Sequence, residues 1–148
     1  MIERGTPRWL FIVCPCGCGE TLPINLDRRS GPAWRLYQHP RWGISLFPSV
    51  WRETGCESHF IIWRDQISRL GRYEEEADFA IATPEDRNAD LAEVIRKRLP
   101  EEGLVSFWDL AESLDTVPWD VLTLCRELVR TGFANEGTGK RRGCFGRK

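Results

Sequence analysis

The feature that most constrains this chain is a cluster of cysteines near its amino end. The segment Cys-Pro-Cys-Gly-Cys-Gly places Cys14, Cys16 and Cys18 at alternate positions, and Gly17 and Gly19 allow the loop to bend. Cysteines two residues apart cannot easily pair with each other, because disulfide geometry is strict. In a reducing compartment, clustered cysteines favour metal ligation over disulfides. We therefore expect the surrounding fold to be built around a bound metal ion.

A second candidate pair follows later in the chain. Cys56 and His59 have the two-residue spacing of a metal knuckle. Tetrahedral zinc takes four ligands, usually thiolate and imidazole, so five candidates compete for four places. The sequence predicts a closed, structural Zn²⁺ site with the Cys56/His59 pair at its centre. Its ligands are expected to be four of these five residues: Cys14, Cys16, Cys18, Cys56 and His59.

A [2Fe–2S] cluster is the alternative cofactor. A cysteine loop followed by a Cys-x-x-His loop, each after a strand, is similar to the Rieske arrangement, in which histidine ligation tunes the potential. Here the first loop offers thiols where Rieske proteins offer histidine. The ligand types therefore favour zinc, and an electron-transfer protein is a lesser alternative.

The pattern along the chain predicts an α+β protein with two parts. Short apolar or alternating segments predict that residues 1–73 form a small metal-binding β domain. An acidic run and a turn sequence place a linker at residues 74–88. A β domain of about 70 residues buries little surface, so a structural metal would contribute much of its stability.

Residues 89–148 are predicted to form a winged-helix-like domain. Apolar residues at helical spacing predict helices over 90–99, 107–114 and 118–131, with a short extended segment between the first two. Gly132 ends the last helix, and a hairpin is predicted beyond it. Helix, short strand, two helices and a hairpin are the order of elements in a winged helix.

The charge of the chain limits its partners. Lys and Arg number 21 against 22 Asp and Glu, which excludes a uniformly basic nucleic-acid coat or a polybasic membrane anchor. Only the predicted wing is basic, through Lys140, Arg141 and Arg142. These three side chains are the candidate contacts of an alternative function, a DNA-binding regulator. The charges of the predicted helix at 118–131 are balanced, so base reading is expected to be weak.

No membrane partner is expected. The longest apolar run, residues 9–13, is too short to span a bilayer. The first residues lack the basic segment, long apolar core and cleavage site of a secretory signal. We therefore expect a cytoplasmic protein.

Two serines are candidate nucleophiles. Ser49 and Ser58 would each need a free base, and His59 is expected to be occupied by the metal. Both serines are therefore expected to stabilise turns. The sequence assigns no catalytic residue and favours a non-catalytic binding module over an enzyme, with a conjugate hydrolase as a lesser alternative.

Three motifs together resemble a bacterial family labelled DUF6527. They are Cys-Pro-Cys-Gly-Cys-Gly at 14–19, Leu-Phe-Pro-Ser-Val-Trp at 46–51 and Cys-Glu-Ser-His-Phe-Ile at 56–61. The resemblance covers about residues 8–72 and leaves the winged-helix-like half as an extension. By position, it implies that the five metal candidates are the family's metal residues and that Pro48, Ser49 and Ser58 are its other marked positions.

The resemblance also implies a biological setting. The loops of that family are similar to those of Rieske-type or rubredoxin-like metal domains, and its members accompany a ubiquitin-like protein, an E1-like adenylyltransferase and an E2-like enzyme. It implies membership of such a conjugation pathway, with antiphage (antiviral) defence as its role. We therefore expect a zinc-binding adaptor or ligase-like accessory factor, which docks an E2-like, E1-like or ubiquitin-like partner through Trp51 and Phe60.

Overall fold

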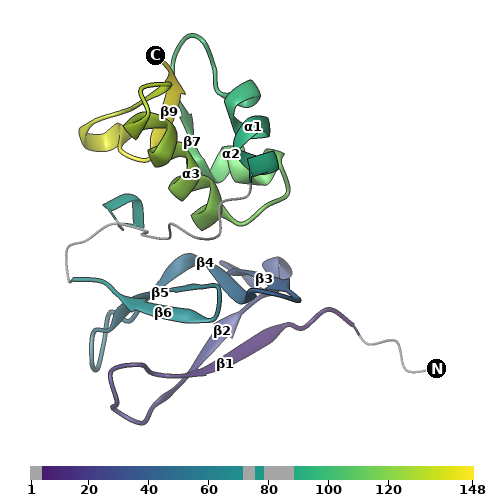
Figure 1. Cartoon of the computed structure of the whole chain (residues 1–148). Helices are drawn as coiled ribbons and strands as arrows, with labels where there is room; N and C mark the ends of the chain where they lie inside the picture. Colours follow the sequence, from purple (N-terminus) through teal and green to yellow (C-terminus); the bar gives the residue numbers. More distant parts are fainter. Residues whose placement is uncertain (1–4, 72–75, 79–88) are drawn as a thin grey trace. The chain divides into compact units, whose positions relative to one another are not determined.

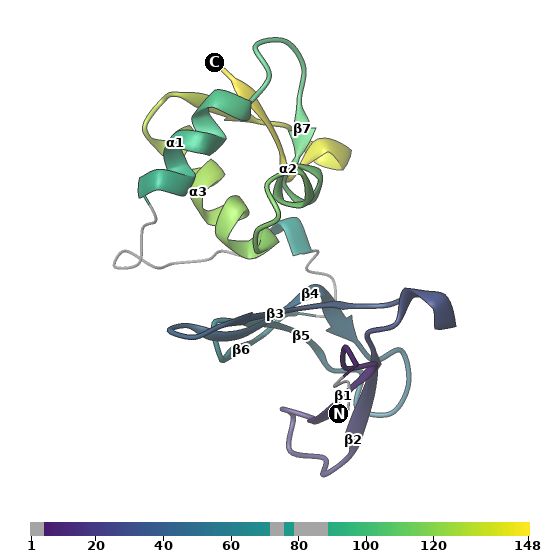
Figure 2. The same cartoon turned by 90° about the vertical axis from the view of Figure 1, so that its right-hand side faces the viewer.

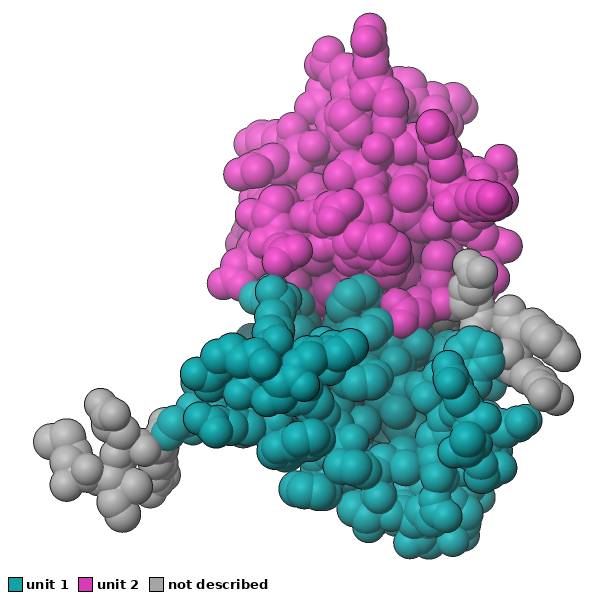
Figure 3. Space-filling model, turned by 180° about the vertical axis from the view of Figure 1, so that it is seen from behind, with its two compact units in different colours: residues 1–74 teal, residues 75–148 magenta. Residues whose placement is uncertain are grey.

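The computed structural model describes residues 5–71, 76–78 and 89–148. The chain divides into two compact units, residues 1–74 and 75–148, which Figure 3 shows in different colours. The linker predicted at 74–88 lies outside the described residues, except for a short 3-10 helix at Glu76–Asp78. Both helices and strands are present, so the α+β prediction is confirmed.

The first unit contains two antiparallel sheets (Figure 1). A two-stranded hairpin joins β1 (Trp9–Val13) to β2 (Thr21–Asn25). A four-stranded sheet has the order β3-β4-β5-β6. Its strands are β3 (Arg35–His39), β4 (Gly43–Trp51), β5 (His59–Trp63) and β6 (Gln66–Arg69).

The core of this unit follows from alternation along the strands. Successive side chains of a strand point to opposite faces. In β2, Leu22 and Ile24 are buried while their neighbours on either side are more exposed. The hairpin directs one face toward the four-stranded sheet, and the core lies between the two sheets. Its buried members are Cys14, Leu22, Ile24, Leu46, Val50, Phe60 and Ile62.

A bulge interrupts the pairing of β4 with β5. Leu46 lies opposite Ile62, and Val50 lies opposite Phe60, so β4 advances four residues while β5 advances two. Extra residues of this kind bend a strand and reorient its side chains. Ser49 lies in the bulge, immediately before the regular pairing resumes.

The described part of the second unit contains three α-helices, which Figure 2 labels, and a three-stranded sheet. Ser106 caps the second helix, since its hydroxyl accepts a hydrogen bond from the backbone N–H of Asp109. Pro118 occupies the first turn of the third helix, where proline fits well. In chain order the elements are α1 (Ala89–Arg98), β7 (Val105–Ser106), α2 (Phe107–Ser113), α3 (Pro118–Arg130), β8 (Ala134–Glu136) and β9 (Cys144–Arg147).

The strands of the second unit are ordered β7-β9-β8. This order of elements follows the one expected from the sequence, and the winged-helix class itself stays a prediction. The unit buries large apolar side chains, including Phe107 and Trp119, whose ring centroids are 6.0 Å apart. Among the described residues, no helix has the length and apolar character needed to cross a membrane.

Candidate functional site

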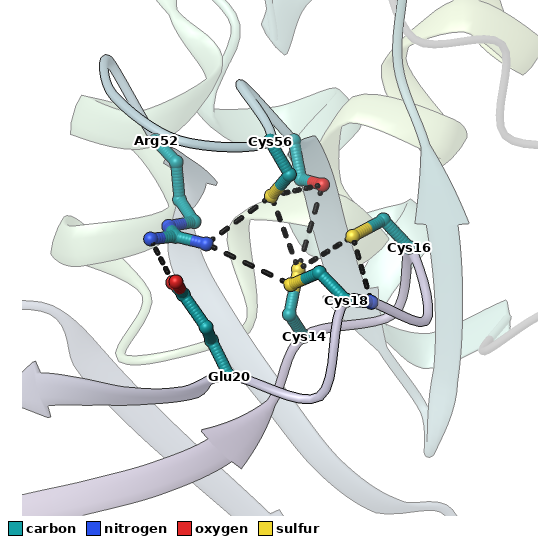
Figure 4. Close-up of polar contacts among 7 residues, drawn as sticks. Cys14, Cys16, Cys18, Glu20, Arg52 and Cys56 are labelled. Atoms are coloured by element: carbon teal, nitrogen blue, oxygen red, sulfur yellow. Dashed lines mark hydrogen bonds and ion pairs between the residues drawn. The ribbon is translucent and has the colours of Figure 1, made fainter.

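Four cysteine thiols converge in the first unit (Figure 4). Cys14, Cys16 and Cys18 belong to the loop that follows β1, and Cys56 belongs to the loop between β4 and β5. All four sulfur atoms lie within 4.8 Å of one another. The Cys14 sulfur is 3.3 Å from that of Cys16 and 3.5 Å from that of Cys56. Two loops far apart in sequence therefore present one group of thiols.

The first loop is sharply bent at its glycines. Gly17 has φ 88° and Gly19 has φ 81°, in a region that glycine adopts without steric cost. The backbone N–H of Cys14 donates to the carbonyl of Glu20 over 2.8 Å, which closes the loop. The N–H of Cys18 points at the Cys16 sulfur, 3.3 Å away. With these contacts in place, the three thiols of the loop lie close to one another.

The donor set fits one tetrahedral metal ion. Zinc–sulfur bonds of about 2.3 Å place neighbouring sulfurs about 3.8 Å apart in a tetrahedron. The observed sulfur distances, from 3.3 Å up to a limit of 4.8 Å, bracket that value. The four cysteines are free thiols and not disulfides. They could hold a metal ion such as Zn²⁺ with no coordination position left open.

The protonation of these thiols is already uneven. The hydroxyl of Ser58 lies 3.1 Å from the Cys56 sulfur, and this hydrogen bond lowers the pKa of Cys56 to about 6. The pKa of Cys18 is lowered by a backbone hydrogen bond at Glu20. The neighbouring thiols, led by Cys16, and burial outweigh this effect and raise the pKa of Cys18 to about 11. A metal ion replaces thiol protons when it binds, so loading of the site would release protons.

Arg52 borders the thiol group from outside. Its Nη1 is 3.2 Å from the Cys56 sulfur and 3.9 Å from that of Cys18, and its Nη2 forms an ion pair with Glu20. The pair with Glu20 raises the pKa of the Arg52 guanidinium, so its charge is permanent. Four thiolates and one divalent ion carry a net charge of about −2, which this guanidinium partly offsets.

His59 lies elsewhere, which differs from the expectation that it pairs with Cys56. It is not part of the four-thiol group; its Nε2 is instead 2.9 Å from the Ser49 hydroxyl oxygen. The reason is strand alternation. Ser58 lies against the thiols, and Phe60 points into the core beside Cys14, so His59 between them faces the opposite side of the sheet.

Ser49, which is half-buried, and His59, which is buried, form a pair held by two strands. The imidazole is 5% exposed, and the 2.9 Å distance is within the range for a nucleophile and its base. The Trp34 indole N–H donates to the Ser49 carbonyl over 3.1 Å and fixes the backbone there. Trp51 stacks on His59, with ring centroids 4.9 Å apart and planes inclined by 15°. Within the described residues, His59 Nδ1 is buried without a hydrogen-bond partner.

The other predicted contact residues have different surroundings. Trp51 is 52% exposed, whereas Phe60 is fully buried in the core and is not accessible to a docking partner. Lys140 and Arg141 belong to a short 3-10 helix, and Arg142 follows it; all three are exposed. Arg142 forms an ion pair with Asp78 at 2.8 Å.

The contact between Ser49 and His59 was not expected from the sequence, because it depends on strand pairing. Ser49 and His59 are ten residues apart, and no local spacing rule connects them. The available signal was that the segments at 44–47 and 59–63 both have the apolar character of strands, and consecutive strands of a small β domain can pair in antiparallel fashion. Such pairing brings the end of the first strand next to the start of the second. The assumption that His59 binds metal kept this signal from being used.

The first unit matches a known protein family. Residues 1–70, a little under half of the chain, match the family model described as "Bacterial ubiquitination-like system serine protease (BubE)". The match covers the thiol group and the Ser49–His59 pair and links the first unit to bacterial ubiquitin-like systems. No curated protein and no solved structure gives a significant match.

Proposed function

We propose that this chain is a serine hydrolase that cleaves peptide or isopeptide bonds within a bacterial ubiquitination-like system. Ser49 is the nucleophile and His59 is its general base. The single observation that carries the proposal is the 2.9 Å contact between His59 Nε2 and Ser49 Oγ, held between two paired strands. The family description, which names a serine protease and covers the same residues, supports it.

The chemistry follows from this pair. His59 Nε2 takes the hydroxyl proton as Ser49 Oγ attacks the carbonyl carbon of the scissile bond. The resulting imidazolium protonates the leaving amine, the carbon–nitrogen bond breaks and an ester to Ser49 remains. Water then attacks this ester, giving its proton to His59, and the acid product leaves while Ser49 regains a proton.

The thiol group would hold the metal of the unit, and we propose Zn²⁺ bound by Cys14, Cys16, Cys18 and Cys56. Held by these thiolates, the ion would join the β1–β2 loop to the β4–β5 loop. With four protein ligands, its part is structural. A two-iron cluster divides its cysteines between two irons, whereas these sulfurs gather within 4.8 Å, which favours a single ion.

An adaptor function is the second candidate, and one observation favours it. Trp9, Phe11 and Val13 are 51%, 66% and 66% exposed along one face of β1. Exposed aromatic side chains on one strand face are typical of protein contact surfaces. Under this alternative, the first unit docks an E1-like, E2-like or ubiquitin-like protein and needs no catalysis.

A DNA-binding regulator has less support. The two basic side chains of α3 are both ion-paired, Arg126 with Glu136 at 3.4 Å and Arg130 with Glu127. A helix that reads bases needs such side chains directed at the groove. We therefore propose that the second unit, as a winged-helix-like domain, has a structural or protein-binding role in the cytoplasm.

The test is cleavage of a ubiquitin-like protein of a bacterial conjugation system, fused through its carboxyl end to a reporter. Ser49→Ala should lower the cleavage rate at least about 1000-fold, because no nucleophile remains. Ser30→Ala, at an exposed serine remote from His59 in sequence, is the matched control and should cleave normally. Cleavage by Ser49→Ala at the wild-type rate would overturn the hydrolase. If the wild-type protein bound the ubiquitin-like fusion without cleaving it, the adaptor function would be the one supported.

A further inference from the structure

We propose that Trp51 is a positioning residue for His59 and takes over the part that a carboxylate has in a catalytic triad. The inference rests on the proposed hydrolase function. Its basis is a juxtaposition: the indole of Trp51 stacks on an imidazole whose second nitrogen is buried and has no hydrogen-bond partner among the described residues.

Among the described residues, the Ser49–His59 pair lacks the third group of a catalytic triad. In a Ser-His-Asp triad, the carboxylate binds Nδ1, holds the imidazole in its working orientation and stabilises the imidazolium that forms during the reaction. In the part of the chain that the structure describes, Nδ1 of His59 has no acceptor beside it. Something else must therefore limit rotation of the ring and offset its transient charge.

Trp51 has the geometry both to limit rotation of the imidazole and to offset its transient charge. The ring planes are 15° apart and the centroids 4.9 Å apart, so the indole covers one face of the imidazole. Rotation of the imidazole about its Cβ–Cγ bond would break this stack and the contact with Ser49 together. The negative face of an indole also attracts a cation, and the imidazole becomes one when it takes the Ser49 proton.

The sheet fixes the position of Trp51 relative to His59. Trp51 is the last residue of β4, His59 is the first of β5, and the two are directly opposite in the antiparallel register. Side chains at such positions are immediate neighbours. Trp51 is nevertheless 52% exposed, so burial in a core does not account for a tryptophan at this position.

The experiment uses the full chain and a fluorophosphonate probe that labels activated serines. Trp51→Leu should slow the labelling of Ser49 about 10-fold or more at saturating probe, with little change in probe affinity. Trp51→Phe keeps a ring and should label within about threefold of the wild-type rate. Trp108→Leu removes a tryptophan of similar exposure, 49%, in the second unit and should label normally.

A spectroscopic measurement keeps the test independent of reactivity. In the wild-type protein, the ring protons of Trp51 and His59 should show nuclear Overhauser contacts, and the His59 signals should carry the ring-current shift of a stacked indole. Trp51→Leu should remove that shift while the signals of the second unit stay unchanged.

The outcomes separate this inference from the function on which it rests. Equal labelling rates for the Phe and Leu variants, or the absence of Trp51–His59 contacts in the wild type, would overturn the inference and leave the hydrolase standing. Absence of any labelling at Ser49 in the wild type would overturn the hydrolase itself. If Trp51→Leu fails to fold, the wild-type contacts decide the question.

Discussion

The two units of this chain differ in how many large side chains they bury and in which polar groups they carry. They have equal length, residues 1–74 and 75–148. Of the largest fully buried side chains among the described residues, eight belong to the second unit and three, Leu46, Phe60 and Ile61, to the first. The first unit instead carries the thiol group, the Ser49–His59 pair and most of the exposed aromatic rings. The second unit thus relies on apolar packing, and under our proposal the first gains stability from metal ligands instead.

The largest effect that the comparison predicts is on catalysis, and it is confined to the first unit. His59→Gln removes the base but keeps a polar side chain, so the rate of reporter cleavage should fall about 100- to 10 000-fold. Thermal unfolding of both units should change little. A His59→Gln variant as active as the wild type would show that activity does not depend on this pair.

Metal removal should affect the units unequally. Cys56→Ser, or a strong chelator, should lower the zinc content from about one per chain to none and collapse the NMR dispersion of the first unit. Signals of the second unit should remain, because its apolar core contains none of the four cysteines of the group. Cys125→Ser, at a buried cysteine outside the group, is the control and should keep its zinc. Loss of both units together would contradict the comparison.

A core substitution in the second unit should do the reverse. Leu122 is fully buried in α3, so Leu122→Ala should lower the free energy of unfolding of that unit by about 2–5 kcal/mol. Zinc content and Ser49 labelling should stay at wild-type values. Val94→Ala, at a residue of α1 that is 41% exposed, should cost less than about 0.5 kcal/mol. Denaturant titrations, monitored by NMR signals specific to each unit, measure the free energies of unfolding of both variants.

The smallest predicted effect is a difference between two exposed thiols of the metal-free protein. The pKa of Cys56 is about 6 and that of Cys18 about 11, so near neutral pH Cys56 is mainly thiolate and Cys18 is protonated. Iodoacetamide at about pH 7.5 should therefore modify Cys56 first, because the thiolate is the reactive form. Peptide mapping by mass spectrometry measures the order, and zinc should protect both. Faster modification of Cys18 than of Cys56 would contradict this prediction.

Much of the first unit was predictable from local patterns. The strands at 9–13 and 59–63 coincide with apolar runs, which are local properties of the sequence. The thiol group was predictable from the spacing of Cys14, Cys16 and Cys18. The choice of its fourth member was not, because it depends on which face of the sheet each residue after Cys56 occupies.

The Ser49–His59 pair was not predictable in the same way. It requires the antiparallel pairing of β4 with β5 and a bulge of two extra residues, and neither has a local signature in the sequence. Phe60 was expected on the surface for the same reason. Its place in the alternation, one residue after His59, directs it into the core.

The most direct test of the account is to identify the serine that a fluorophosphonate modifies. Intact-mass analysis of the zinc-loaded chain should show one adduct, and peptide mapping should locate it at Ser49. His59→Gln should form no adduct under the same conditions, because the hydroxyl then has no base. An unmodified protein, or an adduct at Ser58 that persists in His59→Gln, would contradict the assignment of Ser49 and His59 as the catalytic pair.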